Sequence, residues 1–216
     1  MARSLIALAA GGTGGHVFPA QAVADALNKR GFTPLLLTDR RGAAFAAAIP
    51  GLDFDVLPAA TLRGGFVGRL RGATTMGAAA LKAARLLRPR RAKLLIGFGG
   101  YPSFAPCLGA KLLRLPLVLH EQGTTFSLAN RKLLPMATHV ALSFPLDHPV
   151  AQEARTRHTG PAVRAAIAAV AQSPYPSLDG PIDLLVVGGS QSASIFGETV
   201  PDALCALPDG FRRRLR

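Results

Sequence analysis

Short apolar runs alternate with segments of helical periodicity along most of the chain. The first pair is an apolar run at residues 5–10, followed by a glycine-rich turn and a segment that Pro19 opens, with apolar residues at Val23, Ala26 and Leu27. A run of that length indicates a buried strand, and the later spacing indicates a helix. Repeated strand and helix alternation predicts an α/β protein with a doubly wound parallel sheet.

The same pattern continues to about residue 143. Further strands are expected at residues 32–37, 54–57, 93–98, 115–119 and 138–143. Helices are expected at residues 42–49, 75–87, 104–113 and near 127–134, while residues 62–70 contain three glycines and are expected to form a loop.

A second unit is expected after a proline-rich stretch. Prolines cluster between residues 160 and 181, which is typical of a linker. An apolar run at 182–187, the glycine turn Gly188–Gly189 and a helix at 193–207 then repeat the opening pattern. We therefore predict an N-terminal domain at 1–160, a linker at 161–180 and the start of a C-terminal domain at 181–216. One strand and one helix cannot bury a sheet face, so the second domain is expected to be incomplete, through either fragmentation or loss.

Composition indicates a globular protein. The chain has 216 residues, of which 49% are hydrophobic, and its apolar runs fall short of the roughly 20 residues that span a bilayer. The apolar start is too short for a secretory signal and is interpreted as a strand, so a cytoplasmic location is expected. Cys107 and Cys205 lie far apart, match no metal or redox spacing, and are expected to be reduced.

Positive charge is concentrated in the middle of the chain. The net charge is +13, and residues 56–120 contain no acidic residue. Such a field attracts nucleic acid, an anionic membrane or a phosphorylated substrate, although a solvated basic surface has the same composition. The basic and apolar segment 62–93 is typical of a segment that lies at the surface of an anionic membrane. It is equally typical of a core helix with one solvent-exposed face.

The first glycine turn suits an anion. Its four glycines surround Thr13 and precede a helix, whose free N–H groups carry partial positive charge. Phosphate is the usual guest at such a site. The turn lacks both the dinucleotide spacing and the Gly-Lys-Ser/Thr of a P-loop. Asp39 follows the second strand and can imitate a ribose-binding acid, so a dinucleotide-binding domain stays an alternative.

Several side chains near these turns can carry chemistry. His16 lies at the mouth of the first turn and is either a general base or a structural histidine. His120 and Glu121 follow an expected strand and form either a polarised base or a pair satisfied by hydrogen bonds. Ser190 and Gln191, in the third turn, can donate to a second phosphate.

Five segments together resemble the MurG family, the bacterial transferases that add N-acetylglucosamine to undecaprenyl-pyrophosphoryl-MurNAc-pentapeptide. They are GGTGGHVFPAQAVADAL, GFGGYPSFAP, HEQ with ANR after it, GPAVR and LLVVGGSQSA. The resemblance implies a GT-B fold of two Rossmann-like domains and an inverting transfer from UDP-GlcNAc to that lipid-linked acceptor. It also implies a peripheral place on the cytoplasmic face of the inner membrane. Neither a cofactor, a metal nor a nucleic acid partner is expected.

The resemblance assigns site residues. It implies that Arg164 and Ser190 contact the donor nucleotide. We expect His16 to be the base, with Glu121 as second choice. The remaining expected substrate-binding residues are Thr13, Gly14, Gly15, Gly99, Gly100, Tyr101, Ser103, Asn130 and Gln191.

The chain departs from the family pattern in three places. Gly123 stands where the family has asparagine, Ser127 where it has glycine before ANR, and Ser192 where it has glycine in GGSQGA. The family's uracil and GlcNAc pocket is expected beyond Arg216. A remnant without catalytic activity, which at most binds a lipid-linked diphosphate, is therefore an alternative to the enzyme.

Overall fold

The structure, a computed structural model, describes residues 3–59, 65–148, 155–177, 179–188 and 194–216. It divides into two compact units, Met1–Ala168 and Ala169–Arg216. The division falls inside the stretch expected to be a linker.

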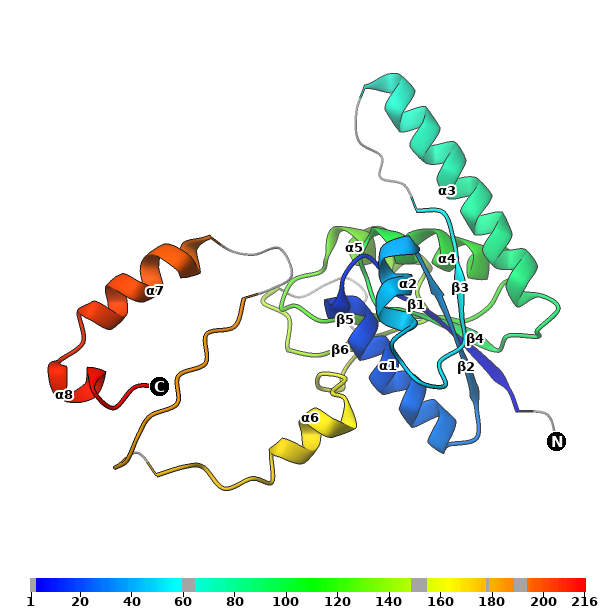
Figure 1. Cartoon of the computed structure of the whole chain (residues 1–216). Helices are drawn as coiled ribbons and strands as arrows, with labels where there is room; N and C mark the ends of the chain where they lie inside the picture. Colours follow the sequence, from blue (N-terminus) through cyan, green and yellow to red (C-terminus); the bar gives the residue numbers. More distant parts are fainter. Residues whose placement is uncertain (1–2, 60–64, 149–154, 178, 189–193) are drawn as a thin grey trace. The chain divides into compact units, whose positions relative to one another are not determined.

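The first unit is built on a parallel sheet of seven strands in the order β3-β2-β1-β4-β5-β6-β7 (Figure 1). The chain starts in the middle of the sheet, runs outward to β3, and then crosses back to β4 beside β1. Ligands of doubly wound sheets bind at the carboxyl ends of strands where the order reverses, which here lies between β1 and β4. The strands are β1 (Leu5–Ala9), β2 (Thr33–Thr38), β3 (Phe54–Val56), β4 (Leu94–Gly97), β5 (Leu117–Glu121), β6 (His139–Leu142) and β7 (Thr156–His158).

Helices cover both faces of this sheet. Alternate residues of each strand point to opposite faces, so Leu8 packs with one buried cluster and Ala7 with the other. The cluster around Leu8 includes residues of α1 (Gly14–Lys29) and α2 (Arg40–Ala46). The cluster around Ala7 includes residues of α3 (Phe66–Leu87), α4 (Tyr101–Leu112) and α5 (Leu128–Leu133). The predicted doubly wound architecture is confirmed.

Helices α1 and α2 begin earlier than the sequence pattern predicted. Helix α1 starts at Gly14 rather than Pro19, because the extended backbone of Thr13 ends the turn there, and Pro19 lies inside the helix. Helix α2 starts at Arg40 rather than residue 42, because the side chain of Asp39 caps it by accepting a hydrogen bond from the Gly42 N–H.

The predicted loop at 62–70 is wrong from Phe66 onward, where α3 begins. Residues 62–64 lie outside the described residues. The glycines of residues 62–70 indicated a loop because of their low helix propensity, whereas α3 runs without a break from Phe66 into the later turns, which pack against α4. The second glycine turn is also shorter than expected, because Tyr101 already begins α4 and Pro102 occupies its first turn, where proline is favoured.

Two elements of the first unit were misplaced or missed. His120 and Glu121 lie within β5 rather than after it, and pair with β6. Strand β7, which pairs with β6, was not predicted, because its short polar sequence Thr-Arg-His carries no apolar alternation. A short 3-10 helix, η1 (Leu134–Met136), follows α5.

The second unit differs most from expectation. The strand predicted at 182–187 does not form: among the described residues Ile182 makes only an isolated bridge to Leu215. A strand needs continuous neighbours, and Leu185 and Val187 are exposed instead. Helix α6 (Ala165–Val170) begins inside the expected linker, and α7 (Ile195–Cys205) and α8 (Asp209–Arg212) complete the chain.

Candidate functional site

Three loops meet at the carboxyl ends of β1, β4 and β5. A Cβ built on Gly99, in the β4–α4 turn, would lie 3.4 Å from Asn130 Nδ2, 3.5 Å from Ser127 Oγ and 3.7 Å from His16 Cε1. The β1–α1 turn, the β4–α4 turn and the β5–α5 loop are therefore in contact. They meet where the strand order reverses, which is the ligand-binding end of such a sheet.

The side chain of Asp39 holds the first glycine turn in place through hydrogen bonds. Its Oδ1 accepts hydrogen bonds from the N–H of Gly12, at 2.8 Å, and of Gly42, at 2.9 Å, and the side chain is buried. Gly12 has a φ of 80°, which glycine adopts readily. Asp39 thus ties the β1–α1 turn to α2, and this structural role weakens the dinucleotide alternative, which needed it to face a ribose.

The start of α1 offers backbone donors at this edge. Thr13 is its N-cap residue and makes no side-chain capping hydrogen bond. Gly14 is buried, and a Cβ there would come within 2.7 Å of Phe18 Cε2, whereas Gly15 is exposed. Uncapped N–H groups and the helix dipole favour an anion here.

His16 is held with one ring nitrogen turned inward. Its Nδ1 lies 2.9 Å from the carbonyl oxygen of Phe98. A carbonyl only accepts, so Nδ1 donates in this contact, and in the neutral ring the lone pair is then on Nε2. Nε2 lies on the side of Gly100, where a Cβ would be 3.1 Å away. His16 is therefore oriented as a proton acceptor.

The second glycine turn passes next to this ring. Gly99 and Gly100 have φ values of 79° and 72°. Ser103 is buried, and its hydroxyl donates to the Gly100 carbonyl at 2.9 Å, so the structure places it as a support of the turn. Tyr101 is partly exposed at the first position of α4.

Glu121 is fully occupied by hydrogen bonds. Oε1 accepts from the N–H of Gln122, at 2.9 Å, and of Gly123, at 3.2 Å. Oε2 accepts from the N–H of Ser127 and from Asn130 Nδ2, both at 2.9 Å. Both oxygens are used by donors of the protein itself, so the geometry of Glu121 is that of an anchor for the β5–α5 loop.

Asn130 and the two departures in this loop belong to the same network. Asn130 is buried, and its Nδ2 also donates to the carbonyl of His120 at 3.0 Å. Ser127, which replaces a family glycine, caps α5 by accepting from the Asn130 N–H at 3.3 Å. Gly123 contributes its backbone N–H to Glu121. Asn130 thus supports the loop from behind.

His120 lies beneath the site. Its Nε2 is 3.3 Å from Ser143 Oγ, and its ring is 5.3 Å from that of Phe98 between centroids. Burial lowers the pKa of His120, while the charge of Glu121 opposes that shift. The alternative of a polarised His120 and Glu121 base is therefore disfavoured, because both side chains are buried and hydrogen-bonded within the protein.

Arg164 and the third turn complete the expected set. The guanidinium carbon of Arg164 lies 4.3 Å from the centre of the Phe18 ring, one turn along α1 from Gly14. Ser190, Gln191 and Ser192 lie outside the described residues. Sequence reasoning missed Gln122 and the Phe98 carbonyl, which both contact His16. Gln122 was visible within HEQ, whereas the sequence could not indicate a backbone contact.

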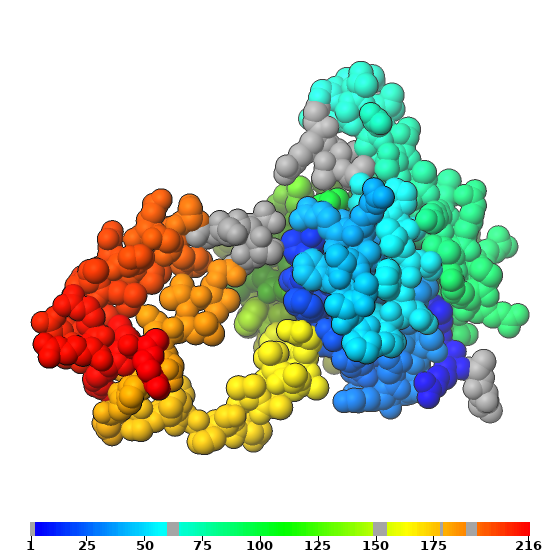
Figure 2. All heavy atoms as spheres, viewed as in Figure 1, coloured from blue at the N-terminus to red at the C-terminus, as the bar shows by residue number. Residues whose placement is uncertain are grey.

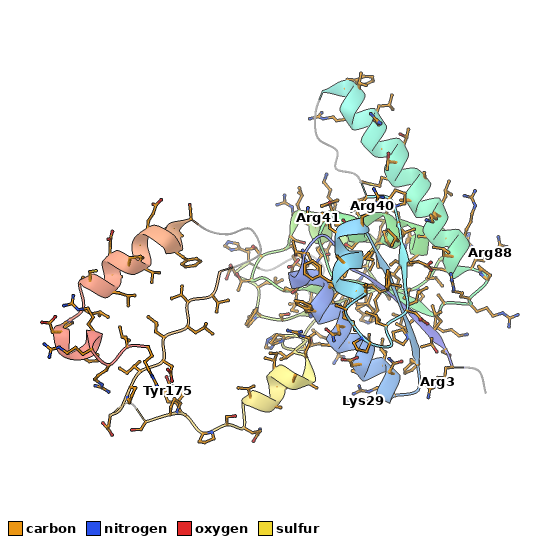
Figure 3. All side chains as sticks on the ribbon, in the orientation of Figure 1. Arg3, Lys29, Arg40, Arg41, Arg88 and Tyr175 are labelled. Carbon is orange, nitrogen blue, oxygen red and sulfur yellow. The ribbon has the colours of Figure 1, made fainter. Side chains whose placement is uncertain are left out.

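Exposed cations surround the first unit. Arg40 and Arg41 lie on α2, and Arg88 follows α3, each on the exterior (Figure 3). Among the described residues, no group of three or more His, Cys, Asp and Glu is placed to hold a metal ion. None of the described helices is both long and apolar enough to span a bilayer.

Comparison with known proteins agrees with this geometry. Residues 6–142 match the Glycosyltransferase family 28 N-terminal domain. The chain is 43% identical, over its whole length, to the UDP-N-acetylglucosamine--N-acetylmuramyl-(pentapeptide) pyrophosphoryl-undecaprenol N-acetylglucosamine transferase of Rhodospirillum centenum. It is 44% identical to the same transferase of Acidiphilium cryptum over 97% of its length. In each case it spans 58% of the relative's length.

Solved structures agree on the fold. The crystal structure of Acinetobacter baumannii MurG superposes with a TM-score of 0.72 at 29% identity, covering 94% of this chain and 58% of that one. A UDP-N-acetylglucosamine 2-epimerase superposes with a TM-score of 0.61 at 11% identity, over 99% and 62% of the two chains, and shows the fold alone. The predicted GT-B class is confirmed. The chain belongs to glycosyltransferase family 28 and, within it, to the MurG family.

Proposed function

We propose that this chain provides the acceptor-binding and proton-accepting half of a transferase that moves GlcNAc from UDP-GlcNAc to undecaprenyl-pyrophosphoryl-MurNAc-pentapeptide. The transferases of Rhodospirillum centenum and Acidiphilium cryptum carry that reaction in their names. One observation carries the proposal to this chain: His16 turns Nδ1 inward to the Phe98 carbonyl and leaves Nε2 beside Gly100, at an uncapped helix start between two glycine turns.

In the proposed reaction, the MurNAc 4-hydroxyl attacks the anomeric carbon of GlcNAc while UDP leaves from the opposite face. A single displacement inverts the anomeric configuration and passes through an oxocarbenium-like transition state. His16 Nε2 accepts the proton of the attacking hydroxyl, and the Phe98 carbonyl stabilises the imidazolium through Nδ1–H. The base contributes about 10²- to 10⁴-fold to the rate.

Backbone donors would hold the acceptor diphosphate. The start of α1 at Thr13, Gly14 and Gly15 and the start of α4 at Gly100 and Tyr101 both lie beside His16 and lack a side-chain cap. Each helix start is favourable for a phosphate. On the donor side, Arg164, Ser190 and Gln191 would contact UDP, and the mechanism needs no further cofactor.

The beginning of α3 would attach the protein to the membrane. The side chains of Phe66 and Val67 are 83% and 77% exposed, and Leu70, Arg69 and Arg71 are exposed beside them. Figure 2 shows this segment, turquoise at the top of the view, standing out from the sheet. Apolar burial and attraction to anionic lipid add together in such a segment. We place the enzyme peripherally on the cytoplasmic face of the inner membrane, without a nucleic acid partner.

Transfer of radiolabelled GlcNAc from UDP-GlcNAc to a lipid-linked MurNAc-pentapeptide diphosphate tests the proposal. Product with the chain, lost in His16→Ala, supports the enzyme. A second candidate is binding of the lipid-linked diphosphate without transfer, which is favoured by the two uncapped helix starts beside His16. Binding of that lipid in the absence of transfer would select this candidate, and a lack of both would contradict the proposed site.

A further inference from the structure

Gln122 lies against the inward edge of His16, and no role has been assigned to it. Its Nε2 is 3.2 Å from His16 Nδ1 and 3.3 Å from the carbonyl oxygen of Phe98. The same oxygen lies 2.9 Å from His16 Nδ1. An atom from α1, one from the β4–α4 turn and one from the β5–α5 loop thus form a triangle at the buried side of the candidate base.

The chemistry of these atoms fixes the protons. A carbonyl oxygen has two lone pairs and can accept both Nδ1–H and an amide N–H. Nδ1 and the Gln122 amide are then both donors, so their 3.2 Å approach is a packing contact rather than a hydrogen bond. A rotated Gln122 would face its own oxygen toward the Phe98 oxygen, which is repulsive. The 2.9 Å contact between Nδ1 and the Phe98 oxygen therefore selects the Nδ1–H tautomer, and Gln122 holds that oxygen in place by donating to it.

The backbone of Gln122 is itself fixed. Its N–H donates to Glu121 Oε1 at 2.9 Å, and Glu121 is anchored on its other oxygen by Ser127 and Asn130. The buried carboxylate thus holds the backbone from which the amide of Gln122 reaches Phe98. Through the side chain of Gln122, the β5–α5 loop therefore helps to hold the ring of His16 in place.

We infer that Gln122 is a positioning residue that, together with the Phe98 carbonyl, holds His16 in the Nδ1–H tautomer with Nε2 facing the acceptor. The catalytic importance of this role rests on the proposed function, in which His16 is the base. Without Gln122, the ring loses the contact along its Nδ1 edge, and water can reach Nδ1. The two tautomers and the flipped ring then become accessible.

Nitrogen NMR of the chain labelled with ¹⁵N-histidine reads this tautomer directly. The His16 signals, assigned by their loss in His16→Asn, should show Nδ1 protonated and Nε2 unprotonated at neutral pH. In Gln122→Met, which keeps the length and removes the donor, the His16 signals should move to averaged positions. An exposed residue, Gln172, gives the matched control Gln172→Met, which should leave them unchanged.

A second variant separates positioning from packing. Gln122→Glu keeps the shape and puts a carboxylate beside Nδ1–H, which favours the protonated imidazole, so His16 should stay protonated to a higher pH in an NMR titration. Unchanged His16 signals in both Gln122 variants, with the remaining spectrum intact, would overturn the inference. Loss of transfer activity alone would not, because the NMR readout needs no substrate. If the His16 tautomer changes in the Gln122 variants but the unchanged protein shows no transfer activity, the positioning role stands and the proposed function is contradicted.

Discussion

Gly100 lies directly against the Nε2 edge of His16. A Cβ at this position would lie 3.1 Å from both Nε2 and Cδ2 of the ring. The backbone of Gly100, at φ 72° and ψ 155°, is also one that side chains rarely adopt. Glycine is therefore required here twice, once by the backbone and once by the ring nitrogen that would accept the proton.

Replacing Gly100 by alanine should lower both stability and activity. The backbone strain costs about 1–3 kcal/mol of unfolding free energy, which chemical denaturation measures. The methyl group also presses on Nε2, so transfer should fall further than the loss of folded protein explains. Gly31→Ala is the matched control, because Gly31 has a φ of 81° and nothing within 4 Å of a built Cβ. Equal activity losses in the two variants would contradict a specific contact with His16.

Glu121 should behave as an anchor rather than a base. In Glu121→Gln, the new side-chain NH2 group takes the place of one carboxylate oxygen. The N–H donors that bind this oxygen in the unchanged protein then lose their acceptor. We expect a loss of roughly 2–3 kcal/mol in unfolding free energy, measured by denaturant titration. Glu198→Gln, on the exposed surface of α7, is the control and should change stability little. If the Glu121→Gln protein is as stable as the unchanged protein but has no transfer activity, Glu121 has a catalytic role instead.

Acid should destabilise the first unit through His120. Burial lowers the pKa of His120 below its ordinary value of 6.5 in the folded protein, so the unfolded chain takes up a proton first as pH falls. This group's contribution to stability is unchanged above about pH 6.5, decreases as pH falls from there, and levels off below the folded pKa. His120→Asn should show a flatter dependence of the unfolding free energy between pH 7 and 5. An identical slope in the variant would assign the acid sensitivity to other groups.

Sequence alone predicted most of the first unit, because buried parallel strands are short apolar runs between glycine turns. Strands β1, β2, β4 and β6 lie where that pattern placed them. The first turns of α1 and α3 were missed, since glycine and proline in these turns are typical of loops, whereas both segments are helical in the structure. The expected strand at 182–187 was apolar enough but had no continuous partner.

The candidate site was predictable in part. His16 and the two glycine turns were named from residue type and spacing, and the fold brings them together. The roles of Glu121, Ser103 and Asn130 could not be separated by sequence, because only geometry shows whether a polar group faces its own backbone or a ligand. The same holds for Gln122, whose contacts come from β1–α1 and β4–α4, far away in the chain.

The beginning of α3 should govern binding to anionic vesicles through two separable contributions. Arg69→Gln with Arg71→Gln removes two charges, each worth about 1 kcal/mol near an anionic surface, so affinity should fall roughly 30-fold at low salt. Phe66→Ser removes apolar burial of about 1.5–3 kcal/mol, and its effect should persist at high salt. Cosedimentation with phosphatidylglycerol vesicles, against phosphatidylcholine alone, measures both.

Tyr175→Ser is the control, because Tyr175 is equally exposed but lies in the second unit (Figure 3). Salt-insensitive binding that neither set of changes weakens would place the membrane contact elsewhere on the protein.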